Sequence, residues 1–220
     1  MIKKLEYQTI VRKRKQCRAC TDLTNPSDPE LSHFDSNDIG PWSRLYGDLD
    51  ATLMIVGQDW GDVRYFLTNQ GLDNLANPTM RTLEKLLLSV GMDVSLREYR
   101  AEAKGLFLTN AILCLKGGGL QAKVHPSWVT NCATLFLKQQ IEIVRPRVVV
   151  SLGQQAYHAI CLAFRIRPKT LRIAVDDPST PIQTGSVLVP VYHCGTRVLN
   201  THRPLETQFT DWLRVREALG

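Results

Sequence analysis

Residues 53–62, LMIVGQDWGD, decide the fold that this sequence predicts. Their first four residues have the length and side chains of a short buried strand, which ends at a polar turn containing glycine. Further apolar runs are likewise followed at once by polar or glycine residues. These runs are 106–108 before Thr109 and Asn110, 148–152 before Gly153, and 188–192 before His193. Such nearly continuous apolar strands are typical of a parallel sheet covered on both faces.

Helical patterns separate these strands. Amphipathic stretches lie at residues 81–90, 127–144, 154–164 and 205–219. Strands that alternate with helices predict an α/β protein, a three-layer α/β/α sandwich around a central four-stranded parallel sheet. Residues 165–185 predict a loop, and the pattern leaves open whether they contain an edge strand. Ligands of open parallel sheets bind at the carboxyl ends of the strands, where this order puts Gln58, Asp59, Asn110 and His193.

The composition is that of an ordinary folded protein. The chain has 220 residues, 44% hydrophobic and 22% charged, which excludes a disordered or low-complexity chain. We expect a single domain, 1–220, on which a basic, cysteine-bearing N-terminal extension, 1–45, is packed. The first residues carry charge with no apolar stretch behind them, and no run approaches the ~18 apolar residues of a membrane span. We therefore expect a soluble, cytoplasmic protein with no membrane partner.

The net charge of +6 lies in one segment. The chain holds 27 basic and 21 acidic residues, and residues 1–20 contain seven of the basic side chains but only one acid, Glu6. The other 200 residues are therefore balanced, with 20 of each sign. A neutral body with one cationic segment favours a local contact with a polyanion, most commonly nucleic acid, and a solvated run of charges remains the alternative.

The six cysteines are not evenly spread. Cys17 and Cys20 form a C-x-x-C, and Cys114 and Cys132 form a C-x17-C far downstream. Cys161 lies in an apolar helical pattern, where a buried structural thiol is the usual interpretation, and Cys194 stands alone. A disulfide framework is not expected in a reducing compartment.

Taken together, these motifs resemble the uracil-DNA glycosylase superfamily. Gly57-Gln58-Asp59 is similar to the opening of the water-activating loop of family 1, the strand ending in Asn110 to the uracil-reading asparagine, and 189–193 to the approach to the catalytic histidine. The cysteine spacing is similar to that of the iron–sulfur-containing family 4 enzymes. The resemblance spans residues 17 to about 203. It implies a DNA repair glycosylase that removes uracil, or a related deaminated base, from single- or double-stranded DNA.

The resemblance gives each site residue a role. Asp59 would orient or activate water and stabilise a cationic sugar, and His193 would donate a hydrogen bond, as a neutral imidazole, to the departing base. Asn110 offers a donor and an acceptor that match O4 and N3–H of uracil, and cytosine presents the reverse pattern. Gly57, Gln58 and the following turn would bind the base.

The stacking partner of the base is the least defined of these groups. Phe66 is the candidate that we choose, and Tyr65 and Trp60 are the alternatives. Core packing is the competing interpretation of each of these aromatic side chains.

The sequence also departs from the family pattern. The usual His-Pro-Ser is replaced by His193-Cys194-Gly195, and the position of the methyl-excluding tyrosine of family 1 is occupied by Gly61, as in family 4. A literal His-Pro-Ser occurs at 125–127, but it precedes a helical pattern, and we interpret it as a helix start. These departures keep a second hypothesis open, a weakly active or inactive nucleic-acid-binding member of the same fold.

Cys17, Cys20, Cys114 and Cys132 would then bind a structural [4Fe–4S] cluster, because four thiolates from distant segments suit such a cluster. Zinc is the alternative, although structural zinc commonly uses two tight knuckles, and free thiols are a third possibility. The cluster would clamp the basic segment to the sheet and bring residues 12–18 near the DNA. We expect a monomer, associated with the nucleoid, that needs no diffusible cofactor. An iron–sulfur redox protein is the remaining hypothesis.

Overall fold

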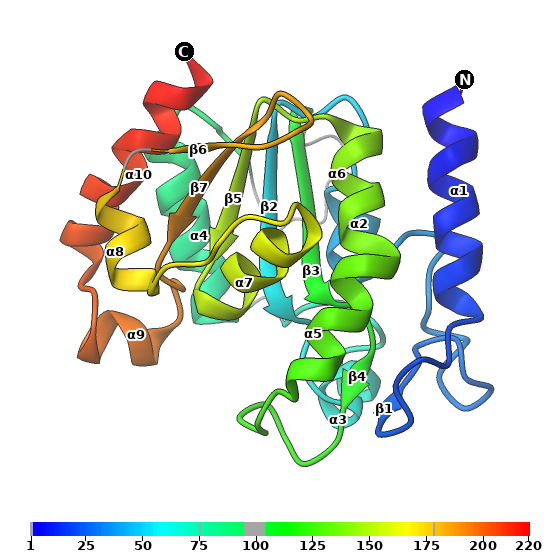
Figure 1. Ribbon diagram of the computed structural model, residues 1–220. Helices are drawn as coiled ribbons and strands as arrows, with labels where there is room; N and C mark the ends of the chain where they lie inside the picture. Colours follow the sequence, from blue (N-terminus) through cyan, green and yellow to red (C-terminus); the bar gives the residue numbers. More distant parts are fainter. Residues whose placement is uncertain (1, 75, 95–103, 178) are drawn as a thin grey trace.

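A five-stranded sheet forms the centre of the computed structural model, which describes residues 2–74, 76–94, 104–177 and 179–220 (Figure 1). Four strands run parallel in the order β3-β2-β5-β7, and a short strand, β6, pairs antiparallel with β7 at one edge. The strands are β2 (Leu53–Asp59), β3 (Leu106–Ile112), β5 (Val148–Leu152), β6 (Thr180–Pro181) and β7 (Val187–Val191). The four apolar runs are the four parallel strands, so the predicted α/β class is confirmed.

The sheet has one strand more than the four that were expected. β6 consists of Thr180 and Pro181 only, and it lies within the stretch 165–185 where an edge strand was left open. A two-residue strand carries no periodic pattern, which is why the sequence did not reveal it. A turn at Gly185, whose φ of 85° suits glycine, returns the chain to β7. Proline has no N–H to offer a further strand, so the sheet ends there.

Helices cover both faces of the sheet and complete the three layers (Figure 1). Alternate residues of β2 enter opposite cores: Met54 and Val56 lie in one, Leu53 and Ile55 in the other. The first core contains residues of α5 (Pro126–Cys132), η1 (Ala133–Leu137), α6 (Lys138–Val144) and α7 (Gln154–Ala163). The second contains residues of α2 (Pro41–Leu45), α3 (Val63–Thr68), α4 (Pro78–Ser89) and α10 (Leu205–Leu219). Over the described ranges, every helix is too short or too polar to cross a membrane.

The helix expected at 127–144 is present as α5, the π-helical turn η1 and α6 in direct succession. It begins after His125, with Pro126 in the first turn, so the literal His-Pro-Ser is a helix start as predicted. It ends at Arg145, which has a left-handed φ of 52° and precedes Pro146. Two shorter helices, α8 (Leu171–Asp176) and α9 (Thr196–Thr201), flank β7 in the chain.

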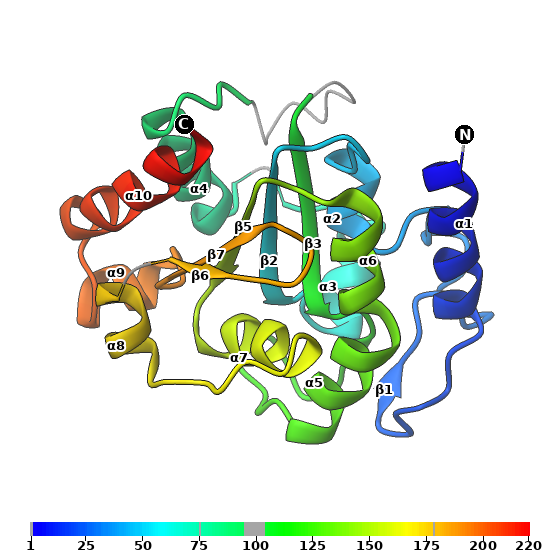
Figure 2. The same cartoon turned by 45° about the horizontal axis from the view of Figure 1, so that its top comes forward.

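The basic N-terminal segment forms a helix, α1 (Ile2–Lys15), along the outside of α6 (Figure 2). Its apolar side chains Tyr7, Ile10 and Val11 are buried in the first core. The expectation that residues 12–18 face DNA must be corrected for Arg14. Its side chain is 1% exposed, and its guanidinium lies 2.8 Å from the Asp35 carboxylate. This arginine anchors the segment that follows α1 instead of offering charge to a ligand.

Candidate functional site

The carboxyl ends of the four parallel strands lie at the lower edge of the sheet in Figure 1. Asn110 of β3 is the register partner of Gly57 in β2, and Asp59 is the last residue of β2. His193 follows the end of β7 by two residues, and its side chain packs beside Gly153, where an added Cβ would lie 3.3 Å from the His193 Cβ. The structure therefore brings these predicted site residues to one edge of the sheet.

Asp59 is buried and held by two donors. Its side chain is 8% exposed, and its Oδ2 accepts hydrogen bonds from Gln58 Nε2 at 2.7 Å and from Lys116 Nζ at 3.1 Å. Both donors go to the same carboxylate oxygen. The other oxygen, Oδ1, has no hydrogen-bond partner within the described residues, so it is the one available to a ligand.

Lys116 is a site residue that the sequence analysis missed. It belongs to β4 (Leu115–Lys116), which pairs antiparallel with β1 (Leu23–Thr24), and its N–H points to the Gly61 carbonyl at 3.4 Å. Its side chain is only 4% exposed. The sole signal in the sequence was a lysine that directly follows an apolar run, and such a pattern is too common to select a site residue.

Asn110 has a buried acceptor with no partner. The residue is 4% exposed, and within the described residues Oδ1 makes no hydrogen bond. A Cβ at Gly57 would lie 2.6 Å from this oxygen and 2.8 Å from the Trp42 ring, so only glycine fits between them. Because a buried polar atom without a partner costs about 1–3 kcal/mol, Asn110 is poised to bind a ligand donor.

His193 is held as a neutral ring with a defined tautomer. Its Nδ1 accepts a hydrogen bond from the Gly195 N–H at 3.0 Å, so in the neutral imidazole the proton is on Nε2. Burial lowers the pKa of His193 below its usual value, and the nearby negative charge of Asp59 opposes this shift. The ring therefore presents Nε2–H as a donor at neutral pH.

The His-Cys-Gly sequence has a structural explanation. A Cβ at residue 195 would lie 2.9 Å from Nδ1 and Cε1 of His193, so glycine lets the ring lie against the backbone of residue 195. Cys194 is fully buried, burial raises the pKa of its thiol to about 12, and its Sγ lies 3.6 Å from the Thr79 carbonyl. Cys194 is thus a neutral packing group, and Gly195 orients the histidine.

The prediction for Phe66 is corrected. Its ring is 0% exposed within the second core, because the Asp62 cap starts α3 at a phase that turns Phe66 inward. The Tyr65 hydroxyl is hydrogen-bonded to Asp73, and Trp60 packs edge-on against Trp42. The aromatic ring that flanks Gly57 together with Asn110 Oδ1 is that of Trp42, a residue that the sequence analysis did not choose.

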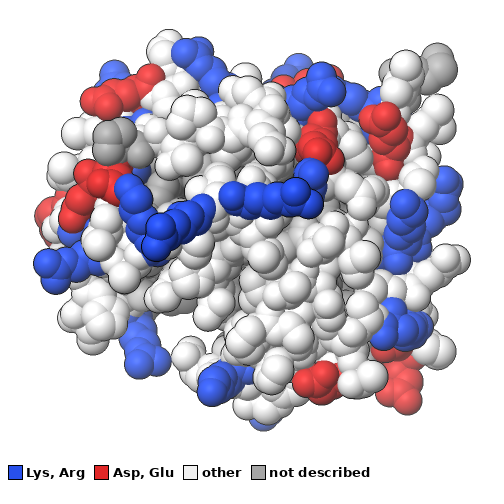
Figure 3. Space-filling model, viewed as in Figure 1, with Lys and Arg blue, Asp and Glu red and all other residues white. Residues whose placement is uncertain are grey.

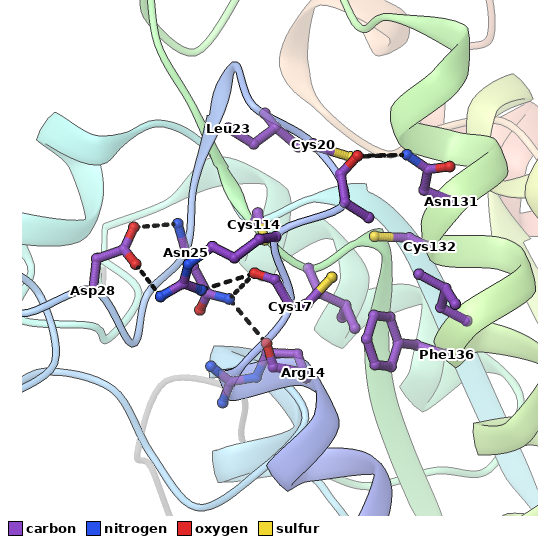
Figure 4. Close-up of a pocket in the computed structure, with 14 residues that line it drawn as sticks. Arg14, Cys17, Cys20, Leu23, Asn25, Asp28, Cys114, Asn131, Cys132 and Phe136 are labelled. Atoms are coloured by element: carbon purple, nitrogen blue, oxygen red, sulfur yellow. Dashed lines mark hydrogen bonds and ion pairs between the residues drawn. The ribbon is translucent and has the colours of Figure 1, made fainter.

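One pocket is lined by all four cysteines that were expected to bind a cluster, Cys17, Cys20, Cys114 and Cys132. It lies between the segment after α1, the end of β3 and α5 (Figure 4). In Figure 4 the sulfur atoms of Cys17 and Cys132 are turned toward the same space. Asn131 Nδ2 donates to Cys20 Sγ at 3.3 Å. Burial raises the pKa of Cys132 to about 12 and that of Cys114 above its usual range, and the negative charges of the other thiolates add to both shifts.

This donor set fits a group that binds thiolates. The pocket contains four thiols and no histidine, and its carboxylate, Asp28, is engaged by Asn25 and Arg18. In the part of the chain that the structure describes, however, no three metal-binding side chains are close enough to hold a single ion. The four thiols line one pocket, so a group bound there would be held by cysteine sulfur.

The fold and the strand-end site, which consists of Asp59, Asn110 and His193, together define a class: α/β proteins that carry an acid, an amide and an imidazole at the carboxyl edge of a parallel sheet. Residues 45–215 match the sequence model of the uracil DNA glycosylase superfamily, and the chain belongs to this superfamily. The chain is also 27% identical over 168 residues to the type-5 uracil-DNA glycosylase of Pyrobaculum aerophilum. That alignment covers 70% of this chain and 69% of the relative.

Proposed function

We propose that this protein is a DNA repair glycosylase that hydrolyses the N-glycosidic bond of uracil, or of a related deaminated base, in DNA. The observation that carries the proposal is the buried, unpartnered Oδ1 of Asn110 at the end of β3. Superfamily membership and the type-5 relative support the same chemistry.

Base recognition follows from the amide of Asn110. An enzyme that acts on a base in DNA first extrudes the nucleotide from the stack into a pocket. Asn110 Oδ1 would accept the N3–H of uracil, and Nδ2 would donate to O4. Cytosine has an acceptor at N3 and a donor at N4, so this orientation of the amide would oppose it at both atoms.

Bond cleavage follows from Asp59 and His193. As the bond to the base breaks, positive charge develops on the sugar and negative charge on the base. Oδ1 of Asp59 would face the sugar and the attacking water, while Nε2–H of His193 would donate to the base oxygen that gains charge. One preorganised donor of this kind contributes about 3–4 kcal/mol to lowering the barrier.

DNA would approach along the edge of the sheet. In Figure 3 the lower edge of the molecule is indented beside α9, which begins three residues after His193, and Lys and Arg side chains lie on either side of the indentation. The positive groups on this face are spread out and do not form one patch, which suits contacts with individual phosphates.

The four cysteines would hold a structural [4Fe–4S] cluster. Bound there, the cluster would supply positive charge that compensates four thiolates and would cross-link the segment after α1 to β3 and α5. The all-cysteine lining of the pocket supports a cluster, and zinc is the alternative. A freshly purified brown protein that contains iron and sulfide would support the cluster, and a colourless zinc protein would refute it.

A base-release assay over a panel of lesions tests the proposed activity. Wild-type protein should release free uracil from single- or double-stranded DNA, and Asp59→Asn and His193→Ala should each slow the reaction steeply. Hypoxanthine and thymine in the same panel define the range of bases.

The second candidate function is DNA binding without catalysis, which the His-Cys-Gly sequence favours. Salt-dependent binding to DNA with no base release at high protein concentration would support it. The same result would refute the glycosylase proposal.

A further inference from the structure

Lys116 is a buried lysine for which the proposed function has not yet given a role. Its ammonium lies 3.1 Å from Asp59 Oδ2, and the two side chains are only 4% and 8% exposed. Burying two charges costs solvation, and a buried ion pair is often no more stabilising than two apolar residues in its place. Stability alone is therefore a weak reason for this pair.

The hydrogen-bond geometry at Asp59 suggests a role for Lys116 in orienting the carboxylate. A carboxylate rotates easily about its last bond, because that torsion is broad and roughly two-fold. In this protein Gln58 Nε2 and Lys116 Nζ both donate to Oδ2, one from the residue before Asp59 and one from β4. Two donors on one oxygen remove the rotational freedom and leave Oδ1 pointing away from both.

Lys116 is itself firmly anchored. Its backbone is paired with Leu23 in the β1–β4 ladder, and it forms a parallel bridge with Asp62 beside the turn that follows β2. The long side chain therefore extends from β4 to the end of β2. An anchored donor of this kind can hold a partner within the tolerance that catalysis requires, because a misplacement of about 1 Å can cost about 10²-fold in rate.

We propose that Lys116 is a positioning residue, which together with Gln58 fixes the Asp59 carboxylate so that Oδ1 faces the water and sugar of the bound nucleotide. The inference rests on the proposed glycosylase function and deepens it. It assigns the ion pair to the orientation of the carboxylate and not to DNA contact, since Lys116 is too buried to reach a phosphate of bound DNA.

Single-turnover kinetics on uracil-containing DNA test this role. Lys116→Met keeps the apolar stem and removes the donor, and it should lower the rate of bond cleavage about 10²-fold with little change in the DNA concentration at half-maximal rate. Lys116→Arg keeps a cationic donor and should recover part of the loss. Lys138→Met, which breaks the exposed pair of Lys138 with Glu142 on α6, is the matched control and should leave the rate unchanged.

A double variant separates positioning from a merely structural effect. If Lys116 acts through Asp59, then adding Lys116→Met to Asp59→Asn should cause no further loss of rate. The double variant also removes both charges of the pair, so it should fold even where Lys116→Met alone is destabilised. Losses that multiply in the double variant, or a Lys116→Met protein as fast as wild type, would overturn the positioning role. Wild-type protein that releases no base would instead refute the proposed function, and with it this inference.

Discussion

The strand-end site and the four-cysteine pocket are both polar sites, but different interactions hold them together. In the strand-end site, Asp59 and His193 each have a protein partner: Asp59 has Lys116 and Gln58, and the ring of His193 has the Gly195 N–H. In the pocket, burial raises the pKa of Cys114 and Cys132, and the negative charges of Cys17 and Cys20 raise both further. The strand-end site is held by contacts within the protein, whereas the proposed cluster would supply the positive charge that the four thiolates of the pocket need.

This difference predicts how the two regions depend on each other. The strand-end site lies on strands whose side chains are buried on both faces, whereas the pocket is assembled from a loop, a strand end and a helix end. One short segment joins them, because Cys114 lies two residues before Lys116. Substitutions in the strand-end site should therefore leave the pocket intact. Loss of a cysteine in the pocket should have only a weak effect on the strand-end site, through β4.

The largest expected effect is on the rate of base release, from a substitution in the strand-end site. Asp59→Asn should lower the rate of uracil release by about 10²–10³-fold, because the neutral amide no longer stabilises the cationic sugar or orients water. The measurement is single-turnover base release, and the visible spectrum of the protein serves as the control. The spectrum of the variant should be that of wild type. A loss of colour in this variant would contradict the expectation that substitutions at Asp59 leave the pocket intact.

Asn110→Asp should have the next largest effect. A carboxylate accepts but does not donate, so it faces O4 of uracil with a second acceptor, and uracil release should fall about 10²-fold. The same carboxylate can accept from N4–H of cytosine, so cytosine release should rise above its wild-type level. Parallel assays on uracil- and cytosine-containing single strands measure both changes. Equal losses on both bases would show that Asn110 does not read the base.

On the pocket side, two buried cysteines form a matched pair. Cys132→Ser removes a ligand of the proposed cluster, and a loss of about 3 kcal/mol would lower the Tm by roughly 6–12 °C in a chain of this size. Cys161 is equally buried but lies outside the pocket, so Cys161→Ser should keep the colour and lower the Tm far less. Equal effects of the two substitutions would mean that the pocket holds no cluster.

Sequence patterns placed the residues of the strand-end site at the sheet edge, but they did not reveal two of the residues around them. Asp59, Asn110 and His193 could be chosen because runs of three to five mostly apolar residues are recognisable, and parallel order brings their ends together. Lys116 and Trp42 could not, because they belong to a two-residue strand and a five-residue helix that leave no periodic signal. Their places are set by tertiary contacts.

Two helices, α3 and α1, explain one wrong prediction and one that was missed, because which side chains are buried depends on how each helix is turned toward the core. Phe66 was the candidate chosen to stack on the base, but the Asp62 cap, whose Oδ1 accepts from the Tyr65 N–H at 2.6 Å, sets the phase of α3. That phase buries Phe66. In α1 the run of basic residues hid three apolar positions, Tyr7, Ile10 and Val11, which pack into the core.

The smallest expected effect is on the pH dependence of the free energy of unfolding, and it comes from His193 in the strand-end site. Burial lowers the pKa of His193 below its usual value of 6.5, so below about pH 6.5 the unfolded chain binds a proton that the folded protein resists. The free energy of unfolding should therefore decrease as the pH falls below about 6.5, and this contribution ends once the pH passes the lowered pKa of the folded state. One proton limits the slope to about 1.4 kcal/mol per pH unit. Urea unfolding of wild type and His193→Gln between about pH 8 and pH 5 measures it, and the variant should show the shallower slope. If the two slopes are identical, His193 is not held neutral by burial, and its proposed role as an Nε2–H donor loses its physical basis.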